Sequence, residues 1–382
     1  MTPARLLFVN HVSSMSGAEF VLAQVAQAFP GASAFLFEQG PLLAALEAHG
    51  LRGIVAKNGA GLGGIKRDKS LVRALPALAK LAGLVREIAG AARAHDVLYA
   101  NSQKAFLLTA LAASIVRRPL VWHLHDILNP EHFGGMQRRL QIGLANRVAT
   151  RVVVPSGACA DAFVEAGGRP EIVAVVPNGV SPPQAAPRPT REALGLPEGP
   201  LVGVFSRLAH WKGQHVLLKA LHETPGVGAI VVGSALFGEE AYERQLRATV
   251  RELGLGDRVT FLGQRNDVMR LMSAVDCVVH PSTLAEPFGL TLVEAMMART
   301  SVVATDAGAA REILDDGRAG QLVTPGDALS LAAALKAFFA APQDFAQQRD
   351  HAALRAAERY SADRMRGDIR ALVEQLAAGR SG

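Results

Sequence analysis

Residues 277–294 read CVVHPSTLAEPFGLTLVE: a short apolar run, a turn-rich loop with Pro287 and Gly289, and a second apolar stretch. The first run suits a buried strand, and the Pro and Gly mark a loop that opens a helix. The backbone N–H groups of a helix start are unpaired and attract an electron-rich ligand. Glu286 and Glu294 stand eight positions apart around this start. Taken alone, they also fit an ordinary helix start with a surface glutamate, and the neighbouring motifs must decide.

Short apolar runs alternate with longer Ala- and Leu-rich stretches along the whole chain. Buried strands joined by helical crossovers predict an α/β fold with two Rossmann-like, doubly wound parallel sheets. The strands are expected at residues 6–10, 34–38, 53–56, 97–100, 120–123, 151–155, 172–176, 201–205, 229–232, 259–262, 277–280, 301–304 and 320–323. Ligands are expected at the carboxyl ends of the strands, in a central cleft faced by both domains.

A Pro-rich linker, residues 181–189, interrupts the pattern after the turn Pro177-Asn178-Gly179. It predicts an N-terminal domain over residues 1–178 and a C-terminal domain over 179–359. The last helix, within residues 360–382, is expected to pack back on the first domain.

Composition narrows the function classes. Residues 1–180 hold 18 basic and 11 acidic residues, and residues 181–382 hold 22 and 23, so all the excess positive charge lies in the first half. Such a half favours an anionic partner, namely a phosphorylated acceptor or an anionic membrane surface. Scarce aromatic residues argue against nucleic acid. No apolar run approaches the length of a membrane span. Two cysteines without CxxC spacing predict a reducing cytoplasm and no structural zinc.

The expected strand 201–205 runs into Ser206-Arg207-Leu208-Ala209-His210-Trp211-Lys212-Gly213. Arg207 and Lys212 beside a helix start suit a diphosphate, because Arg offers a planar fork and Lys a mobile point charge. The alternative is a solvated pair of charges. No Walker pattern is present, so this is not a P-loop.

Together, these motifs resemble the donor domain of retaining glycosyltransferases of family GT4, which have the GT-B fold, and the resemblance covers most of the chain. It implies that Arg207 and Lys212 neutralise the donor diphosphate, that Glu286 contacts sugar hydroxyls near the anomeric centre, and that Glu294 binds the ribose hydroxyls. Backbone N–H groups are implied to hold sugar and phosphate oxygens at Phe288, Gly289, Leu290 and Thr291. Arg265 is a candidate near the nucleobase.

In the first domain, Ser16-Gly17-Ala18-Glu19 resembles the Gly-Gly-Ala-Glu loop of the family, with Ser16 in place of the first Gly. Gly17 is implied to approach the donor phosphates. His125, after the expected strand 120–123, matches the active-site His of the family. His123 is the alternative, and a purely structural pair is the third interpretation. A His there can hydrogen-bond the donor sugar or the leaving group.

Other features are interpreted more plainly. Residues 59–64 contain a literal GxGxxG without the acidic partner of a dinucleotide site, and they predict a loop near the acceptor. The basic stretch from Lys66 to Arg93 is either a solvated helix face or a contact for an anionic membrane or acceptor. His280 is interpreted as structural, with a place in the lining of the donor pocket as the alternative. Arg299 and Ser301 replace the usual Gly and Pro of the family, and Gly308-Ala309 replaces a Gly-Gly pair, and these changes are expected to tighten the donor pocket.

The resemblance implies transfer of a sugar, with retention, from a UDP- or GDP-sugar to a glycan or lipid-linked anionic acceptor in cell-envelope polysaccharide or glycolipid synthesis. No cofactor or metal is expected, because no Asp-x-Asp motif appears and Arg207 with Lys212 can replace a divalent ion. The protein is expected in the cytoplasm, including the inner face of the membrane. The alternatives are a sugar-nucleotide epimerase of the same fold and a catalytically silent scaffold subunit.

Overall fold

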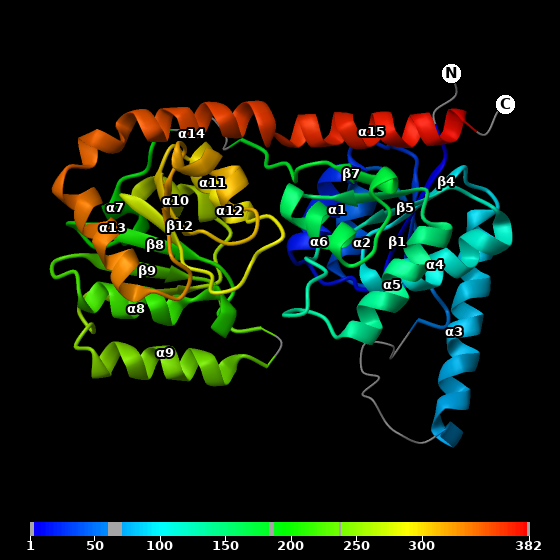
Figure 1. Cartoon of the computed structure of the whole chain (residues 1–382), viewed down its shortest axis with the longest axis horizontal. Helices are drawn as coiled ribbons and strands as arrows, with labels where there is room; N and C mark the ends of the chain where they lie inside the picture. The colour runs from blue at the N-terminus through cyan, green and yellow to red at the C-terminus, as the bar shows by residue number, and fades with distance from the viewer. Residues whose placement is uncertain (1–3, 60–70, 183–186, 237, 380–382) are drawn as a thin grey trace. The chain divides into compact units, whose positions relative to one another are not determined.

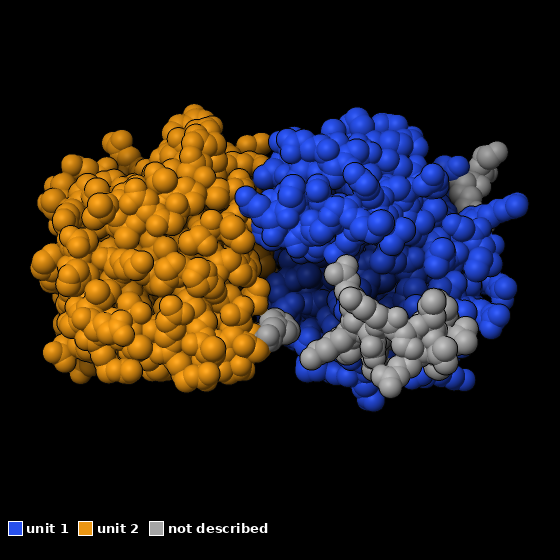
Figure 2. Space-filling model, turned by 60° about the horizontal axis from the view of Figure 1, so that its bottom comes forward, with its two compact units in different colours: residues 1–179, 362–382 blue, residues 180–361 orange. Residues whose placement is uncertain are grey.

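The computed structural model describes residues 4–59, 71–182, 187–236 and 238–379, and for residues 71–78 the backbone alone. The chain divides into unit 1 (Met1–Gly179 with Ala362–Gly382) and unit 2 (Val180–Ser361), which Figure 2 colours separately. The sequence placed this boundary one residue earlier. Most of the GxGxxG stretch, the centre of the Pro-rich linker, and Lys66, Arg67 and Lys69 lie outside the described residues.

Unit 1 is built on a parallel sheet of seven strands in the order β3-β2-β1-β4-β5-β6-β7. Figure 1 labels β1, β4, β5 and β7 of this sheet. The strands are β1 (Leu6–Asn10), β2 (Ser33–Leu36), β3 (Arg52–Val55), β4 (Val97–Ala100), β5 (Leu120–His123), β6 (Arg151–Val154) and β7 (Val173–Val175). The helices are α1 (Gly17–Ala26), α2 (Pro41–Ala48), α3 (Leu71–Ala92), α4 (Gln103–Val116), α5 (Gly135–Val148), α6 (Gly157–Glu165) and α15 (Ala362–Ala378).

Unit 2 contains a parallel sheet of six strands in the order β10-β9-β8-β11-β12-β13. The strands are β8 (Leu201–Phe205), β9 (Gly228–Val232), β10 (Val259–Gly263), β11 (Cys277–His280), β12 (Ser301–Thr305) and β13 (Gln321–Val323). The helices are α7 (Arg191–Leu194), α8 (Gln214–His222), α9 (Glu240–Glu252), α10 (Val268–Ala274), α11 (Leu290–Met297), α12 (Ala310–Ile313), α13 (Ala328–Ala340) and α14 (Ala346–Arg359).

Both faces of the unit 2 sheet are buried, which is why its strands are nearly continuous apolar runs. Leu201 and Phe205 belong to the core cluster on one face, and Val202 and Val204 belong to the cluster on the other. The sequence therefore predicted both parallel sheets correctly, and all thirteen expected strands are present, with ends that shift by at most two residues.

The C-terminal helix α15 completes unit 1 although it follows unit 2 in the chain. Its residues Met365, Ile369 and Val373 are buried, and α15 packs against α1 and β4. Arg366 donates hydrogen bonds to the side chains of Gln24 and Gln27 on or beside α1. None of the helices in the described part of the chain is long and apolar enough to cross a bilayer.

Candidate functional site

In each sheet, the strand order reverses at one point, and in open α/β sheets ligands generally bind at the carboxyl ends of the two strands that meet there. In unit 2, this point lies between β8 and β11, and in unit 1 it lies between β1 and β4. The loops after β8 and β11 carry Arg207, Lys212 and Glu286, so the topology brings these three predicted site residues to one edge of the sheet.

The loop after β8 is organised around Trp211. The Lys212 ammonium lies 4.2 Å from the centroid of the Trp211 ring, and the Arg207 guanidinium carbon lies 5.4 Å from it. Both cations are therefore attracted to one indole ring. The backbone carbonyl of Trp211 accepts a hydrogen bond of 2.8 Å from the backbone N–H of Thr283, in the loop after β11. Sequence reasoning assigned Trp211 no role, yet it positions both charges.

Gly213 lets the two loops approach. Its φ is +72°, and a Cβ there would lie 1.8 Å from the backbone oxygen of Pro281, so only glycine fits. The next residue, Gln214, is buried and donates hydrogen bonds of 2.9 Å to the Ser206 hydroxyl and the Arg207 carbonyl. The shape of the loop after β8 is thus fixed by one close backbone contact and one buried amide.

Glu286 forms the centre of a buried polar cluster and is 7% exposed. One carboxylate oxygen, Oε1, lies 2.7 Å from Lys212 Nζ and 2.9 Å from His280 Nε2, and it also accepts a hydrogen bond from the Ser282 hydroxyl. Lys212 and Glu286, to which the resemblance gave separate parts of the donor, are therefore in direct contact in the structure.

The electrostatics of this cluster keep Glu286 charged. Burial by itself raises the pKa of the Glu286 carboxyl, but the opposing effects of His280 and Lys212 hold that pKa well below its usual range. A carboxylate whose pKa is held this low is also a weaker base and a weaker nucleophile, although all three partners contact only its Oε1. This arrangement is suited to orienting a ligand rather than to attacking one.

His280 does more than the structural interpretation predicted. It stands at the carboxyl end of β11, and its second ring nitrogen, Nδ1, lies 3.2 Å from the hydroxyl of Thr291 in the first turn of α11. It therefore connects Glu286 to the helix start. The signal that could have identified it is its place at the end of a strand beside the reversal point.

The start of α11 offers backbone groups rather than side chains. Gly289 precedes the helix with a φ of +102°, and Leu290 and Thr291 open it. The first N–H groups of a helix lack partners within it, and they attract negative charge. The Phe288 side chain is buried and packs edge-on against Tyr360 at 5.7 Å, so only its backbone can serve a ligand.

The backbone at Gly308 and Ala309 packs closely against the backbone of Glu286. The backbone oxygen of Glu286 accepts a hydrogen bond of 3.1 Å from the N–H of Ala309. Gly308 has a φ of +59°, and a Cβ there would lie 2.3 Å from the same oxygen. The retained glycine of the Gly308-Ala309 pair is therefore the one that the close approach requires.

Glu294 contrasts with Glu286. It lies on α11 and is mostly buried, and burial raises the pKa of its carboxyl to about 7. Within the described ranges, no side chain or backbone N–H donates a hydrogen bond to this carboxylate. A buried carboxylate without donors is costly, and hydroxyl groups of a ligand would relieve that cost.

Arg265 follows β10 and forms a forked ion pair with Asp267, with nitrogen–oxygen distances of 2.8 and 2.7 Å. Both side chains are partly exposed, so the pair contributes little to stability. The predicted role of Arg265 near a nucleobase remains a prediction.

In unit 1, the loop before α1 is closed by its own side chains. Glu19 is buried and accepts a hydrogen bond of 3.0 Å from Asn10 at the end of β1, and the Ser16 hydroxyl also donates to it. Ser16, which replaces a glycine of the family pattern, thus forms a hydrogen bond to Glu19 within the loop. A Cβ on Gly17 would meet nothing within 4 Å, so Gly17 faces open space.

His125 is held in one tautomer by Asn101, which follows β4. The Asn101 amide nitrogen donates to the backbone carbonyl of Ala18 at 3.3 Å, so its oxygen faces His125 Nε2 at 2.9 Å. Nε2 must therefore carry the proton, and Nδ1 is left as an acceptor. Burial lowers the pKa of His125 to about 3, so the imidazole is neutral at physiological pH.

His123 lies beneath His125, with ring centroids 3.9 Å apart. It is 1% exposed, and its Nδ1 lies 2.7 Å from the Tyr99 hydroxyl. Burial and, secondly, the neighbouring His125 lower the pKa of His123 well below its usual range. Of the two candidate histidines, only His125 keeps an exposed surface.

Comparisons with known proteins cover both units. Residues 188–357 match the family model described as "Glycosyl transferases group 1", and residues 22–179 match the "Glycosyl transferase 4-like domain". The crystal structure of HepE from Anabaena in complex with UDP is 37% identical, covers 97% of this chain and 100% of that one, and superposes with a TM-score of 0.85.

Two curated relatives match over shorter stretches. The lipopolysaccharide core biosynthesis mannosyltransferase LpcC of Rhizobium leguminosarum bv. viciae is 37% identical over 177 residues, 44% of this chain and 50% of the relative. The phosphatidyl-myo-inositol mannosyltransferase of Mycobacterium leprae is 33% identical over 63% of each chain. The matched stretches thus span about half to two thirds of these relatives.

Proposed function

Because the chain belongs to the group 1 glycosyltransferases, enzymes of the GT-B fold, we propose that it moves a sugar from a nucleotide-diphosphate sugar to a glycan or lipid-linked acceptor. The observation that carries the proposal is the cluster of Lys212, His280 and Glu286 beside the start of α11. Glu294, on α11, has no hydrogen-bond donor among the described residues. The diphosphate of such a donor needs cations. Its sugar needs fixed polar groups, and its ribose needs a hydrogen-bond acceptor.

In this proposal, Arg207 and Lys212 stabilise the negative charge that develops on the departing diphosphate, together with the N–H groups of Leu290 and Thr291. Glu286 orients sugar hydroxyls, and Glu294 accepts from the ribose. We propose no divalent metal, since the two cations supply the charge that an ion would otherwise supply. Activity should therefore persist in excess EDTA, and a loss restored by added Mg²⁺ would overturn this point.

We further propose that the anomeric configuration is retained without a covalent sugar–enzyme intermediate. The lowered pKa of Glu286 makes its carboxylate a weak nucleophile, and the neutral His125 offers hydrogen bonds but no carboxylate. Analysis of the product linkage by nuclear magnetic resonance tests retention. Inversion, or a sugar trapped covalently on Glu286, would contradict the proposal.

The donor is best tested first. UDP, GDP and their sugars should raise the melting temperature selectively, because a ligand that binds only the folded state stabilises it by mass action. The structure of HepE with UDP-glucose favours UDP. A sugar nucleotide converted to its epimer without any acceptor would support the epimerase alternative instead. Unchanged glycan synthesis in cells carrying Glu286→Ala would support a silent scaffold subunit.

For the acceptor, we propose an anionic lipid-linked or phosphorylated glycan at a membrane surface. The support is the excess of basic residues in the first half and the exposed Met136 and Leu140, 80% and 60% accessible, beside Arg139 on α5. Sedimentation with anionic liposomes at low salt should detect binding, and Met136→Gln with Leu140→Gln should weaken it. Failure to bind such vesicles would count against the membrane part of the proposal.

A further inference from the structure

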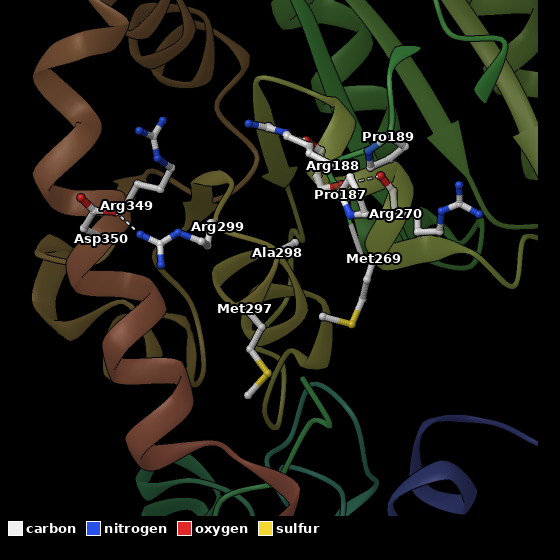
Figure 3. A pocket seen from close by; sticks show the side chains of 11 residues that line it. Pro187, Arg188, Pro189, Met269, Arg270, Met297, Ala298, Arg299, Arg349 and Asp350 are labelled. Carbon is white, nitrogen blue, oxygen red and sulfur yellow. Dashed lines mark hydrogen bonds and ion pairs between the residues drawn. The ribbon is translucent and has the colours of Figure 1, made fainter. Parts of the chain in front are cut away.

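A second group of cationic side chains surrounds a pocket of about 440 Å³ in unit 2 (Figure 3). Its charged lining residues are Arg188, Arg270, Arg299, Arg349 and Asp350, four cations and one anion. Figure 3 shows Arg188 and Arg270 on one side, and Arg299, Arg349 and Asp350 on the other. The volume lies in the range of about 300–1,000 Å³ that is usual for small-molecule sites.

This pocket is separate from the residues around Glu286. Arg299 follows the last turn of α11 and lies two residues before β12, so the pocket opens at the amino ends of the strands. The Glu286 loop and Thr291 lie at the opposite end of α11. A helix of eight residues is about 12 Å long at 1.5 Å per residue, so one ligand of ordinary size would not reach both.

The positive charge of the pocket is only partly neutralised by the protein. Asp350 pairs with Arg299 at 2.7 Å. In the part of the chain that the structure describes, no carboxylate lies within ion-pair distance of Arg188 or Arg349. Arg188 donates a hydrogen bond to the backbone carbonyl of Ser273. Burial and the neighbouring charge of Arg349 lower the pKa of its guanidinium, and Asp276 opposes this shift. The guanidinium groups of Arg188 and Arg349 repel each other, and an anion bound between them would replace this repulsion by attraction to both.

We propose that this pocket binds a phosphate-bearing anion at a site distinct from the donor. The cations that line it are all arginines, whose planar forks match phosphate oxygens in pairs. The side chains of Met269 and Met297, which also line the pocket, are flexible and apolar and can cover the non-phosphate part of such a ligand. The same phosphate chemistry is offered by a soluble phosphate ester and by a phospholipid headgroup.

Calorimetric titration of the full chain with inorganic pyrophosphate, with excess UDP present, tests the site. Arg188→Gln with Arg349→Gln should weaken binding at least about tenfold, because each lost pair is a charge-assisted contact. Asp350→Asn should tighten binding, because it frees Arg299. The matched control is Arg244→Gln with Arg251→Gln, which removes the same charge from exposed positions on α9 and should change nothing.

Flotation with phosphatidylglycerol vesicles distinguishes the two sources. Reduced flotation of the Arg188/Arg349 double variant relative to the α9 control assigns the pocket to a headgroup. Weaker pyrophosphate binding with unchanged flotation assigns it to a soluble ligand. The proposal is overturned if the double variant binds both probes as the unmodified protein does, or if the α9 control loses as much. Melting temperatures of all variants show whether any loss reflects unfolding.

Discussion

Replacing Lys212 by Met removes the ammonium group that contacts Glu286 and leaves a buried carboxylate short of a partner. Coulomb's law over 2.7 Å, with an effective dielectric constant of about 20, gives roughly 6 kcal/mol of attraction. Part of this is offset, because the lysine no longer has to be desolvated, and because His280 and Ser282 remain in place. We therefore expect a loss of about 2–3 kcal/mol, at or just below the lower limit of the roughly 3–5 kcal/mol that breaking a buried pair costs.

The assay is calorimetric melting of the full chain, compared with Lys219→Met, the same substitution at an exposed lysine of α8. For a unit of this size, the loss corresponds to a fall of about 4–12 °C in melting temperature. The control should change by about 1–2 °C or less.

The stability lost in Lys212→Met should depend on pH in one direction. The lowered pKa of Glu286 gives stability that is present above the unfolded pKa of the carboxyl and is lost as the pH falls through the folded pKa. Lys212→Met moves the folded pKa upward, so its deficit should be full at pH 7 and should shrink as the pH falls below about 4.5. A deficit of equal size at pH 7 and pH 4, or an equal fall in Lys219→Met, would refute the reasoning.

Three further variants test other parts of the site. Gly308→Ala should lower the free energy of unfolding by at least about 1–2 kcal/mol and weaken UDP binding. The new Cβ would meet the Glu286 carbonyl, and residue 308 has a positive φ. Thermal melting with and without UDP measures both effects. Glu294→Gln should raise the melting temperature at pH 8 but not at pH 4, because the raised pKa makes the charged carboxylate destabilising and the carboxyl is charged only at the higher pH. Calorimetric titration of the same variant should show weaker UDP binding. Asn101→Leu should lower kcat about 10–100-fold by releasing His125, with an unchanged Kd for UDP, and equal losses in both would contradict a positioning role.

The fold could be predicted from the sequence because the central strands of both sheets are buried on both faces and appear as apolar runs, whereas the edge strands β3, β7, β10 and β13 are partly exposed. β1, β4, β5, β8 and β11 begin and end at the predicted residues. The other strand ends are displaced by one or two residues, and terminal residues make few hydrogen bonds to fix them.

The site was readable only in part. Arg207, Lys212 and Glu286 could be chosen by motif, but their contact depends on β8 and β11 being neighbours and on Gly213 meeting Pro281. Neither the strand order nor the contact between Gly213 and Pro281 can be predicted from a local sequence pattern. The same holds for Asn101, which meets His125 because β4 lies beside β5.

The return of α15 to unit 1 has a consequence for synthesis on the ribosome. Unit 1 begins the chain, but the buried Met365, Ile369 and Val373 that complete it are made only after all of unit 2. At about 5–20 residues per second, the 182 residues of Val180–Ser361 take roughly 9–36 s. Throughout that interval, the residues of α1 and β4 that α15 covers in the finished protein lack this partner, and their apolar surface stays accessible to chaperones until α15 has been made.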